Sequence, residues 1–388
     1  MHNNSLANTS GIRSKKPKFL MIASYGKSII PFRGALIKSI QLLGMEVHML
    51  FPNAENEEVC NELKNWGVVV HDYKLQRRGT SIFFEIFTLL NLFVKIVSVK
   101  PRIILCYTIK PVIYTGLVKL IFRNFDLYPM ITGLGYAFQK KENQLKITQK
   151  IAQKLYRISL LSAKKVFFQN PDDLHFFRDN QILKSDTPFQ IINGSGVDIN
   201  FYSPCSLPTK ISFLLIARLL NAKGIVEYLE AAQTIKQHCS EVNFKLVGLI
   251  ESGVDSIPTN LINSLKTNYP IEFLGSLKDV RTAIAESSVF VLPSYREGTP
   301  RTVLEAMAMG RAIITTDVPG CRETVIDGHN GYLVPPRDSK ALSEAMARFL
   351  DDPSLAQTMG KRSREMAVEK YDVKKVNAVL HKEMNLIN

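Results

Sequence analysis

The chain has 388 residues, which is too long for one ordinary hydrophobic core and predicts two domains of about 150–200 residues each. Its 46% hydrophobic and 22% charged residues are typical of a folded globular protein and exclude a disordered or fibrous one. The net charge of +14 is uneven, because residues 1–200 hold 27 Lys and Arg against 14 Asp and Glu, whereas residues 201–388 hold 22 against 21. The basic half is expected to face an anionic partner, either nucleic acid or a membrane surface, or to be a solvated basic face.

Residues 1–17 are polar and basic and lack the apolar core of a signal peptide, so we expect a disordered lead-in and no export. Cysteine usage points to a reducing cytoplasm. The sequence predicts neither a disulfide framework nor a zinc site, because no Cys-x-x-Cys pair occurs among Cys60, Cys106, Cys205, Cys239 and Cys321.

The N-terminal half begins with a βαβ pattern. A strand over Phe19–Ala23, a turn containing Gly26 and an amphipathic helix precede a second strand over Val47–Phe51. Further short apolar runs, separated by segments of helical length, follow at Val68–Val70, Ile103–Cys106, Tyr128–Ile131, Val166–Phe168 and Gln190–Ile192. This alternation predicts one α/β domain over residues 18–198, with a parallel sheet and crossover helices.

The apolar run "SIFFEIFTLLNLFVKIVSVK" (Ser81–Lys100) predicts a helix of this domain. Only nine uncharged residues separate Glu85 from Lys95, fewer than the roughly twenty needed to span a bilayer, so we expect no transmembrane helix. One face supplies a predicted core stripe of Ile82, Ile86, Leu89, Leu90, Phe93, Ile96 and Val97. The remaining residues favour either an interfacial helix on anionic lipid or a fully buried helix: apolar Phe83, Phe84, Phe87 and Val94, beside basic Arg77, Arg78, Lys95, Lys100 and Arg102.

The second half repeats the architecture after "NGSGVD" (Asn193–Asp198), whose glycines suit a hinge. Strands are predicted at Ser212–Ala217, Asn243–Val247, Glu272–Leu274, Val289–Leu292, Ala312–Thr315 and Gly331–Val334. We expect a second α/β domain over residues 199–370. Residues 371–388 are expected to form a C-terminal helix that packs back on the N-terminal domain.

The stretch "REGTPRTVLEA" (residues 296–306) carries two carboxylates, Glu297 and Glu305, separated by seven residues. Pro300 is suited to a helix start, and the unpaired N–H groups and positive dipole end of such a start are a natural seat for a phosphate. Gly298 would let a ligand approach the backbone closely. The two acids would then hold hydroxyl-bearing groups on either side of a diphosphate, which is the shape of a nucleotide sugar.

Two cations complement this stretch. Arg218 and Lys223, in "IARLLNAKG", lie where a strand ends and a helix begins, and ligands bind at the carboxyl ends of strands in open α/β sheets. Arg218 offers a bidentate fork and Lys223 a compact charge for a diphosphate. Taken alone, an Arg and a Lys at this spacing are more often solvated surface residues.

At these residues the sequence resembles the retaining, GT-B-fold glycosyltransferases of family 4. The resemblance rests on "ARLLNAKG", "LVG" (Leu246–Gly248), the hinge "GVD" and "FVLPSYREGTPRTVLEAMAMGRAIITTDVPGCRETVIDGHNGYLVPPRD". It implies two Rossmann-like domains that face each other across a cleft. The N-terminal half is similar to bacterial members that build cell-surface glycans on a polyprenyl-diphosphate carrier, through "SYGKSIIPFR", "YTIKP" and "MITGLGYAF".

The resemblance implies a role for each matching residue. Glu297 would contact the donor sugar and Glu305 the ribose, while Arg218 and Lys223 would neutralise the diphosphate, so that Glu297, Arg218 and Lys223 are the expected catalytic set. The other expected donor-binding residues are Gly26, Gly248, Gly298, Thr299, Pro300, Arg301 and Thr302. Many relatives carry a histidine after the fourth strand, and this chain has Tyr107, Thr108 and Lys110 there instead. The expected acceptor side is completed by Thr132, Gly133 and Gly135.

The implied reaction moves a sugar, expected to be an N-acetylhexosamine, with retention from a UDP-sugar to a polyprenyl-diphosphate-linked saccharide in surface polysaccharide biosynthesis. The departing diphosphate would take the acceptor proton, and protein cations would replace a metal cofactor. The adjacent acids of "NPDDLHFF" (Asn170–Phe177) are predicted to follow a helix cap rather than to bind a metal. The implied location is the cytoplasmic face of the inner membrane, with peripheral association.

Several alternatives compete with this hypothesis. Glycosidases also use two carboxylates, but a phosphate-ready helix start between Glu297 and Glu305 does not suit hydrolysis of a neutral sugar. A nucleotide-sugar 2-epimerase has the same double-domain fold and cleaves the same bond. A catalytically silent nucleotide-sugar sensor is disfavoured by the intact acids and cations. Nucleic-acid binding is disfavoured because no recognised motif accompanies the basic charge.

Overall fold

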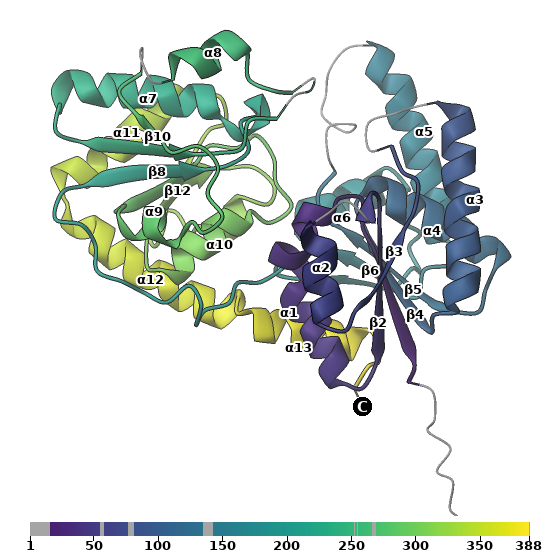
Figure 1. The fold of residues 1–388 in the computed structure, drawn as a ribbon. Helices are drawn as coiled ribbons and strands as arrows, with labels where there is room; N and C mark the ends of the chain where they lie inside the picture. Colours follow the sequence, from purple (N-terminus) through teal and green to yellow (C-terminus); the bar gives the residue numbers. More distant parts are fainter. Residues whose placement is uncertain are drawn as a thin grey trace, which may run out of the picture.

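The computed structural model describes residues 16–54, 58–76, 81–134, 143–251, 253, 255–265 and 269–387. Figure 1 shows two α/β domains, each built on a twisted parallel sheet with helices on both faces. This confirms the predicted fold class. The physical basis is the run of buried residues along most strands, since a strand covered on both faces is apolar throughout rather than at alternate positions.

The N-terminal sheet has seven strands in the order β3-β2-β1-β4-β5-β6-β7, and every neighbouring pair is parallel. Each strand predicted in this half is present. Their bounds are β1 Lys18–Ile22, β2 Glu46–Phe51, β3 Val69–Asp72, β4 Ile103–Tyr107, β5 Asp126–Ile131, β6 Val166–Phe168 and β7 Phe189–Ile191.

Helices cover both faces of this sheet and enclose two apolar cores. One core lies under α1 (Ile29–Leu42) and α2 (Glu58–Asn65). The other lies under α3 (Ile82–Val99), α4 (Ile109–Ile121), α5 (Asn143–Leu160) and α6 (Pro171–Asp179).

The structure contradicts the fully buried alternative for the helix α3 and part of its predicted core stripe. Its buried residues are Thr88, Leu92, Ile96 and Val99, so the predicted core stripe is wrong for Ile82, Ile86 and Leu90, which are more than half exposed. Phe83 is 87% exposed, which excludes the fully buried helix. By length and composition α3 could cross a membrane, and it is the one helix of the described residues that could, but it packs on α4 through its buried side.

The C-terminal sheet has six parallel strands in the order β10-β9-β8-β11-β12-β13. They are β8 Ser212–Ile216, β9 Asn243–Val247, β10 Glu272–Phe273, β11 Val289–Leu292, β12 Ala312–Thr316 and β13 Gly331–Val334. The helices are α7 Ile225–His238, α8 Thr259–Ser264, α9 Arg281–Ala285, α10 Arg301–Ala308, α11 Ser339–Asp351 and α12 Ser354–Lys370.

Strand order reverses once in each sheet, between β1 and β4 in the first domain and between β8 and β11 in the second. At such a switch point the connections leave toward opposite faces, and a crevice opens beyond the carboxyl ends of the two strands. The loops that follow these four strands are therefore the expected ligand-binding positions of the two domains.

Two segments cross between the domains side by side. The amide of Val197 donates to the carbonyl of Tyr371 at 2.8 Å, and the amide of Val373 donates to the carbonyl of Val197 at 3.0 Å. Gly196 has a φ of +68°, and a Cβ built there would lie 2.6 Å from Cα of Val373, so glycine is required at this crossing. Beyond it, α13 (Val373–Glu383) packs against α1 of the N-terminal domain.

Candidate functional site

The N-terminal crevice is formed by the loops after β1 and β4. The Thr108 hydroxyl donates to the hydroxyl of Ser24 at 2.8 Å and ties the two loops together. Thr108 has φ 69° and ψ 159°, a conformation that a β-branched residue adopts only under strain. Such strain is concentrated at functional sites, and Thr108 was predicted from the sequence as an acceptor-side residue. Gly26 begins the short helical turn after β1 and is buried.

The two other predicted residues of this loop have different surroundings. Tyr107 is buried, its hydroxyl has no hydrogen-bond partner among the described residues, and burial raises the pKa of its phenol. The Lys110 amine instead bonds the Glu85 carboxylate of α3 and the Gln76 carbonyl, the latter at 2.7 Å. The positive charge of Lys110 is therefore compensated, and Glu85 connects the first turn of α4 to α3.

The C-terminal crevice brings Lys223 and Glu297 together. Lys223 ends a 3-10 turn after β8, and its Nζ donates to Oε1 of Glu297 in the loop after β11. The same oxygen accepts a 2.8 Å hydrogen bond from the Ser294 hydroxyl. Both partners of the ion pair are largely buried. The Glu297 carboxylate is thus held in place by two hydrogen-bond donors, of which only Lys223 was among the predicted site residues.

Arg218 lies in the same loop as Lys223 but has a separate partner. Its Nη1 atom lies 3.2 Å from a carboxylate oxygen of Glu251, and its side chain is 45% exposed. The structure therefore does not bring Arg218 into contact with Glu297. Gly248, at the end of β9, is tightly packed, because a Cβ there would overlap the Ala217 carbonyl oxygen and lie 2.7 Å from the Leu219 side chain.

The helix α10 begins at Arg301 after an extended Pro300, as the sequence predicted. Glu305 is buried inside its second turn and accepts hydrogen bonds from Arg301 Nε at 2.7 Å and from the Tyr202 hydroxyl at 2.9 Å. Burial and the neighbouring carboxylate raise the pKa of Tyr202. Tyr202 lies 103 residues from Glu305, which is why a local motif could not identify it.

The loop between Glu297 and α10 contacts the N-terminal domain. A Cβ on Gly298 would overlap the Thr132 carbonyl oxygen and lie 2.6 Å from Oε1 of Gln169. The facing domain therefore requires glycine at position 298. The sequence predicted only that Gly298 would let a ligand approach, and it did not indicate this packing constraint. Gly133, with φ +114°, lies opposite, and a Cβ there would lie 3.3 Å from the Gly298 amide nitrogen. The predicted residue Gly135 lies outside the described residues.

The segment "NPDD" provides the rest of the domain contact. Asn170 caps α6 by accepting from the Asp173 amide at 2.8 Å, as predicted, and its Nδ2 also donates to the Gly298 carbonyl at 3.0 Å. The Thr299 hydroxyl donates to the Gln169 carbonyl at 3.1 Å. Asp173, fully buried, bonds Arg296. The sequence located the cap but missed these contacts, which join residues more than 120 positions apart.

A second cross-domain pair lies beside the first. Arg322 Nη1 is 3.2 Å from the Asp172 carboxylate, and both side chains are more than one third exposed. In the part of the chain that the structure describes, no group of three or more His, Cys, Asp or Glu residues is arranged to hold a metal ion. The acids of "NPDD" therefore serve here as partners for arginines of the other domain.

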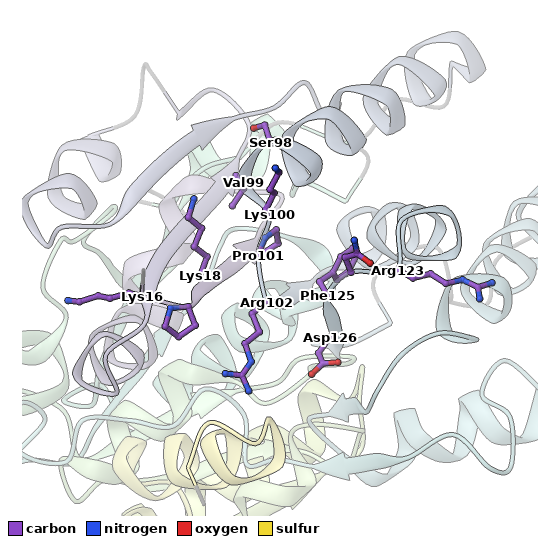
Figure 2. A pocket seen from close by; sticks show the side chains of 12 residues that line it. Lys16, Lys18, Ser98, Val99, Lys100, Pro101, Arg102, Arg123, Phe125 and Asp126 are labelled. Carbon is purple, nitrogen blue, oxygen red and sulfur yellow. The ribbon is translucent and has the colours of Figure 1, made fainter. Parts of the chain in front are cut away.

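A basic hollow lies at the amino ends of the strands of the N-terminal sheet, where α3 ends and β1, β4 and β5 begin. Its volume is about 730 Å³. Figure 2 shows Lys16, Lys18, Lys100, Arg102 and Arg123 around it, with Asp126 as the one labelled acid. Asp126 is already paired with Lys164 at 2.6 Å. The hollow thus places a cluster of positive charge at the C-terminal end of α3.

Comparison with known proteins agrees with this geometry. Residues 206–366 match the family described as Glycosyl transferases group 1. The N,N'-diacetylbacillosaminyl-diphospho-undecaprenol alpha-1,3-N-acetylgalactosaminyltransferase of Campylobacter jejuni is 26% identical, over 89% of this chain and 93% of the relative. The capsular polysaccharide biosynthesis glycosyltransferase CapM of Staphylococcus aureus is 24% identical, over 92% and 94% respectively.

Solved structures share the fold at low sequence identity. Sucrose-phosphate synthase from Thermosynechococcus elongatus superposes with a TM-score of 0.77 at 20% identity, covering 95% of this chain and 98% of that one. HepE of Anabaena, solved in complex with UDP-glucose, superposes with a TM-score of 0.76 at 18% identity, covering 95% and 100%. The expected GT-B architecture is therefore confirmed over nearly the whole chain.

Proposed function

We propose that this glycosyltransferase, whose residues 206–366 match the family described as Glycosyl transferases group 1, moves a sugar from a UDP-sugar to a polyprenyl-diphosphate-linked saccharide with retention. The observation that carries the proposal is the contact of the Gly298 loop of one domain with Thr132 and Asn170 of the other. Lys223, Glu297 and the start of α10 lie on one domain, and the loops after β1 and β4 lie on the other. A donor and an acceptor would each occupy one side.

The donor site would work mainly by electrostatics. The backbone amides at the start of α10 would donate to a diphosphate, and Lys223 would supply a compact positive charge for it. Glu297 would accept hydrogen bonds from sugar hydroxyls and Glu305 from those of the ribose. Each charge-stabilising donor aimed at a leaving group contributes about 3 kcal/mol to lowering a barrier.

The ion pairs of Lys223 and Arg218 imply an exchange of partners when a diphosphate binds. Lys223 bonds Glu297, and Arg218 bonds Glu251, so a bound diphosphate would draw both cations toward itself and free Glu297 for the sugar. We propose that these cations and the amides provide the charge compensation that a metal ion gives in other transferases. The departing diphosphate oxygen would then accept the acceptor proton.

The relatives' names support the choice of substrates. The Campylobacter jejuni relative is named for an undecaprenol-diphosphate acceptor and an N-acetylgalactosamine donor group, and the HepE structure contains UDP-glucose. By analogy we propose an N-acetylhexosamine donor, a lipid-linked acceptor and a role in surface polysaccharide biosynthesis for this chain.

Substrate panels test this function. Purified protein is incubated with a set of UDP-sugars and short polyprenyl-diphosphate-sugar acceptors, and an elongated lipid product with retained anomeric configuration is expected. Chelation of divalent ions with EDTA is expected to leave the rate unchanged. Steady conversion of UDP-N-acetylglucosamine without an acceptor would instead favour the 2-epimerase alternative and refute transfer.

We also propose that the N-terminal domain binds an anionic membrane surface peripherally, on the cytoplasmic face of the inner membrane. The exposed apolar side of α3 would enter the interface, and the basic hollow at its end would attract anionic headgroups. Each basic residue near such a surface contributes about 1 kcal/mol. This geometry would bring the acceptor-side crevice to a lipid-linked substrate through Glu85 and Lys110, which connect α3 to that crevice.

Vesicle flotation tests the membrane surface. Binding is expected to vesicles that contain phosphatidylglycerol and to be weak on pure phosphatidylcholine. Phe83→Glu with Phe87→Glu is expected to abolish it, whereas Leu42→Glu, at an equally exposed apolar position on α1, is the matched control. Salt-sensitive retention on DNA with no binding to anionic vesicles would overturn this proposal.

A further inference from the structure

Arg33, on α1, is a buried cation without a compensating acid. Its side chain is only 3% exposed, and among the described residues no carboxylate bonds it. Its contacts are weak: Nη1 lies 3.3 Å from the neighbouring Phe32 carbonyl, Nη2 lies 2.8 Å from Sδ of Met130, and the guanidinium lies 5.1 Å from the Tyr107 ring. Its Nε atom has no partner in the described part of the chain. Burying a guanidinium in this way costs several kcal/mol.

A second buried arginine shows what this fold provides when the role is structural. Arg311 is 1% exposed, and its three nitrogens donate to the carbonyls of Ile284, Cys205, Ser206 and Ala285 at 2.9–3.2 Å. Carbonyl acceptors therefore satisfy Arg311 throughout. The contrast indicates that the N–H groups of Arg33 have a role in binding rather than in stabilising the fold.

The position of Arg33 indicates which partner it lacks. Tyr107, whose ring it contacts, is the last residue of β4 at the N-terminal crevice, and its hydroxyl is likewise buried without a partner among the described residues. The adjacent Phe32 lies beneath the guanidinium of Arg301, 5.5 Å away, at the start of α10. Burial lowers the pKa of Arg33, and repulsion from Arg301 lowers it further. Arg33 and Arg301, two cations from opposite domains, thus repel each other. Among the described residues no carboxylate bonds Arg33.

We propose that Arg33 and Tyr107 form an anion subsite that binds a phosphate group of a substrate diphosphate. Arg33 Nε and the Tyr107 hydroxyl would donate to phosphate oxygens, which would satisfy both orphaned donors and compensate the buried charge. The inference rests on the proposed transferase function. The phosphate comes either from the nucleotide of the donor or from the lipid diphosphate of the acceptor, and these two sources are separated by measurement.

The test compares Arg33→Met, which keeps much of the side-chain volume, with Tyr107→Phe, which removes only the hydroxyl. UDP affinity is measured by calorimetry, and the acceptor KM is measured by transfer of labelled sugar. Because each variant loses a hydrogen bond to a charged group, the binding of one substrate is expected to weaken by about 10- to 100-fold in both variants. Weaker UDP binding assigns the phosphate to the donor. A raised acceptor KM with unchanged UDP affinity assigns it to the acceptor.

Stability provides a readout that a structural arginine would not reproduce. Arg33→Met is expected to unfold at the same or a higher temperature than the wild type, because it removes an uncompensated buried charge. Arg311→Met is expected to unfold at a lower temperature, because it leaves buried carbonyls unpaired. If Arg33→Met fails to fold, its role is structural, and the inference is overturned unless Tyr107→Phe still weakens one substrate.

One comparison separates this inference from the proposed function. Lys223→Ala should lose UDP affinity if the donor site is correct. Suppose that Lys223→Ala loses UDP affinity, while Arg33→Met and Tyr107→Phe keep both their UDP affinity and their acceptor KM within twofold of the wild type. The anion subsite is then wrong, and the transferase proposal survives. If Lys223→Ala also binds UDP normally, the donor-site assignment itself fails.

Discussion

Replacing Asp173 with Asn should impair transfer without unfolding the protein. Asp173 is fully buried on α6 and bonds Arg296. Arg296 directly precedes Glu297 in the loop between β11 and α10, here called the donor loop. The substitution keeps the side-chain shape but removes the charge that holds this loop against the N-terminal domain. A charge-assisted hydrogen bond of this kind stabilises by about 1.5–3 kcal/mol, so kcat/KM should fall by about 10- to 100-fold.

The stability of this variant follows from the Asp173 pKa. Burial raises the pKa of the carboxyl in spite of the opposing attraction from Arg296, so burial of the charge costs more than the pair returns. For a raised carboxyl pKa, the folded state disfavours ionisation, and stability at neutral pH is lower than it would be with a neutral group. Asp173→Asn should therefore leave the free energy of unfolding within about 1 kcal/mol of the wild type, because the lost attraction and the relieved burial cost offset each other.

The neighbouring acid is the matched control. Asp172→Asn breaks the other cross-domain pair, with Arg322, but both side chains are more than one third exposed, and such pairs contribute about 0–1 kcal/mol. Steady-state transfer and urea unfolding are measured for both variants. If Asp173→Asn keeps kcat/KM within twofold of the wild type, or if Asp172→Asn loses as much, the donor loop does not depend on the buried pair.

Three further predictions concern other parts of the chain. Lys223→Ala and Glu305→Ala should each lower the rate of transfer at least about tenfold by weakening the binding of the donor substrate. A normal UDP affinity by calorimetry in either variant would contradict the assignment of that residue. Gly298→Ala should lower kcat/KM at least about tenfold, because its Cβ would overlap the Thr132 carbonyl and separate the domains; unchanged kinetics would show that the domains need not meet there. Burial, His48 and nearby lysines lower the pKa of His71 to about 4, so the unfolded chain takes up a proton near pH 6.5 that the folded chain does not bind until about pH 4. Urea unfolding should therefore show stability falling by about 1–2 kcal/mol from pH 7 to pH 5 after allowance for solvent screening. A His71→Gln variant should show a weaker dependence, and the remainder is expected because burial also lowers the pKa of His48 and His381.

Local patterns were sufficient for the architecture and for part of the site. The apolar runs at β1, β4, β8 and β11 are continuous because each strand is buried on both faces, and that continuity is visible in the sequence. Pro300 and Asn170 were recognisable because helix starts and caps depend on neighbouring residues only. The core stripe of α3 was predicted wrongly, because which side of an apolar helix is covered depends on the partner that packs against it.

Tertiary structure alone decided the partners of the charged groups. Asp173 and Arg296 are separated by 123 residues, and Arg33 and Met130 by 97, so no spacing rule connects them. Their pairing depends on how two independently patterned domains meet, which is a matter of geometry rather than of local preference. The sequence by itself determined two parallel sheets and the Glu297–Glu305 motif at a helix start. Only the folded chain decided that Arg33 is buried with no described acid beside it, because burial is a property of everything around a residue.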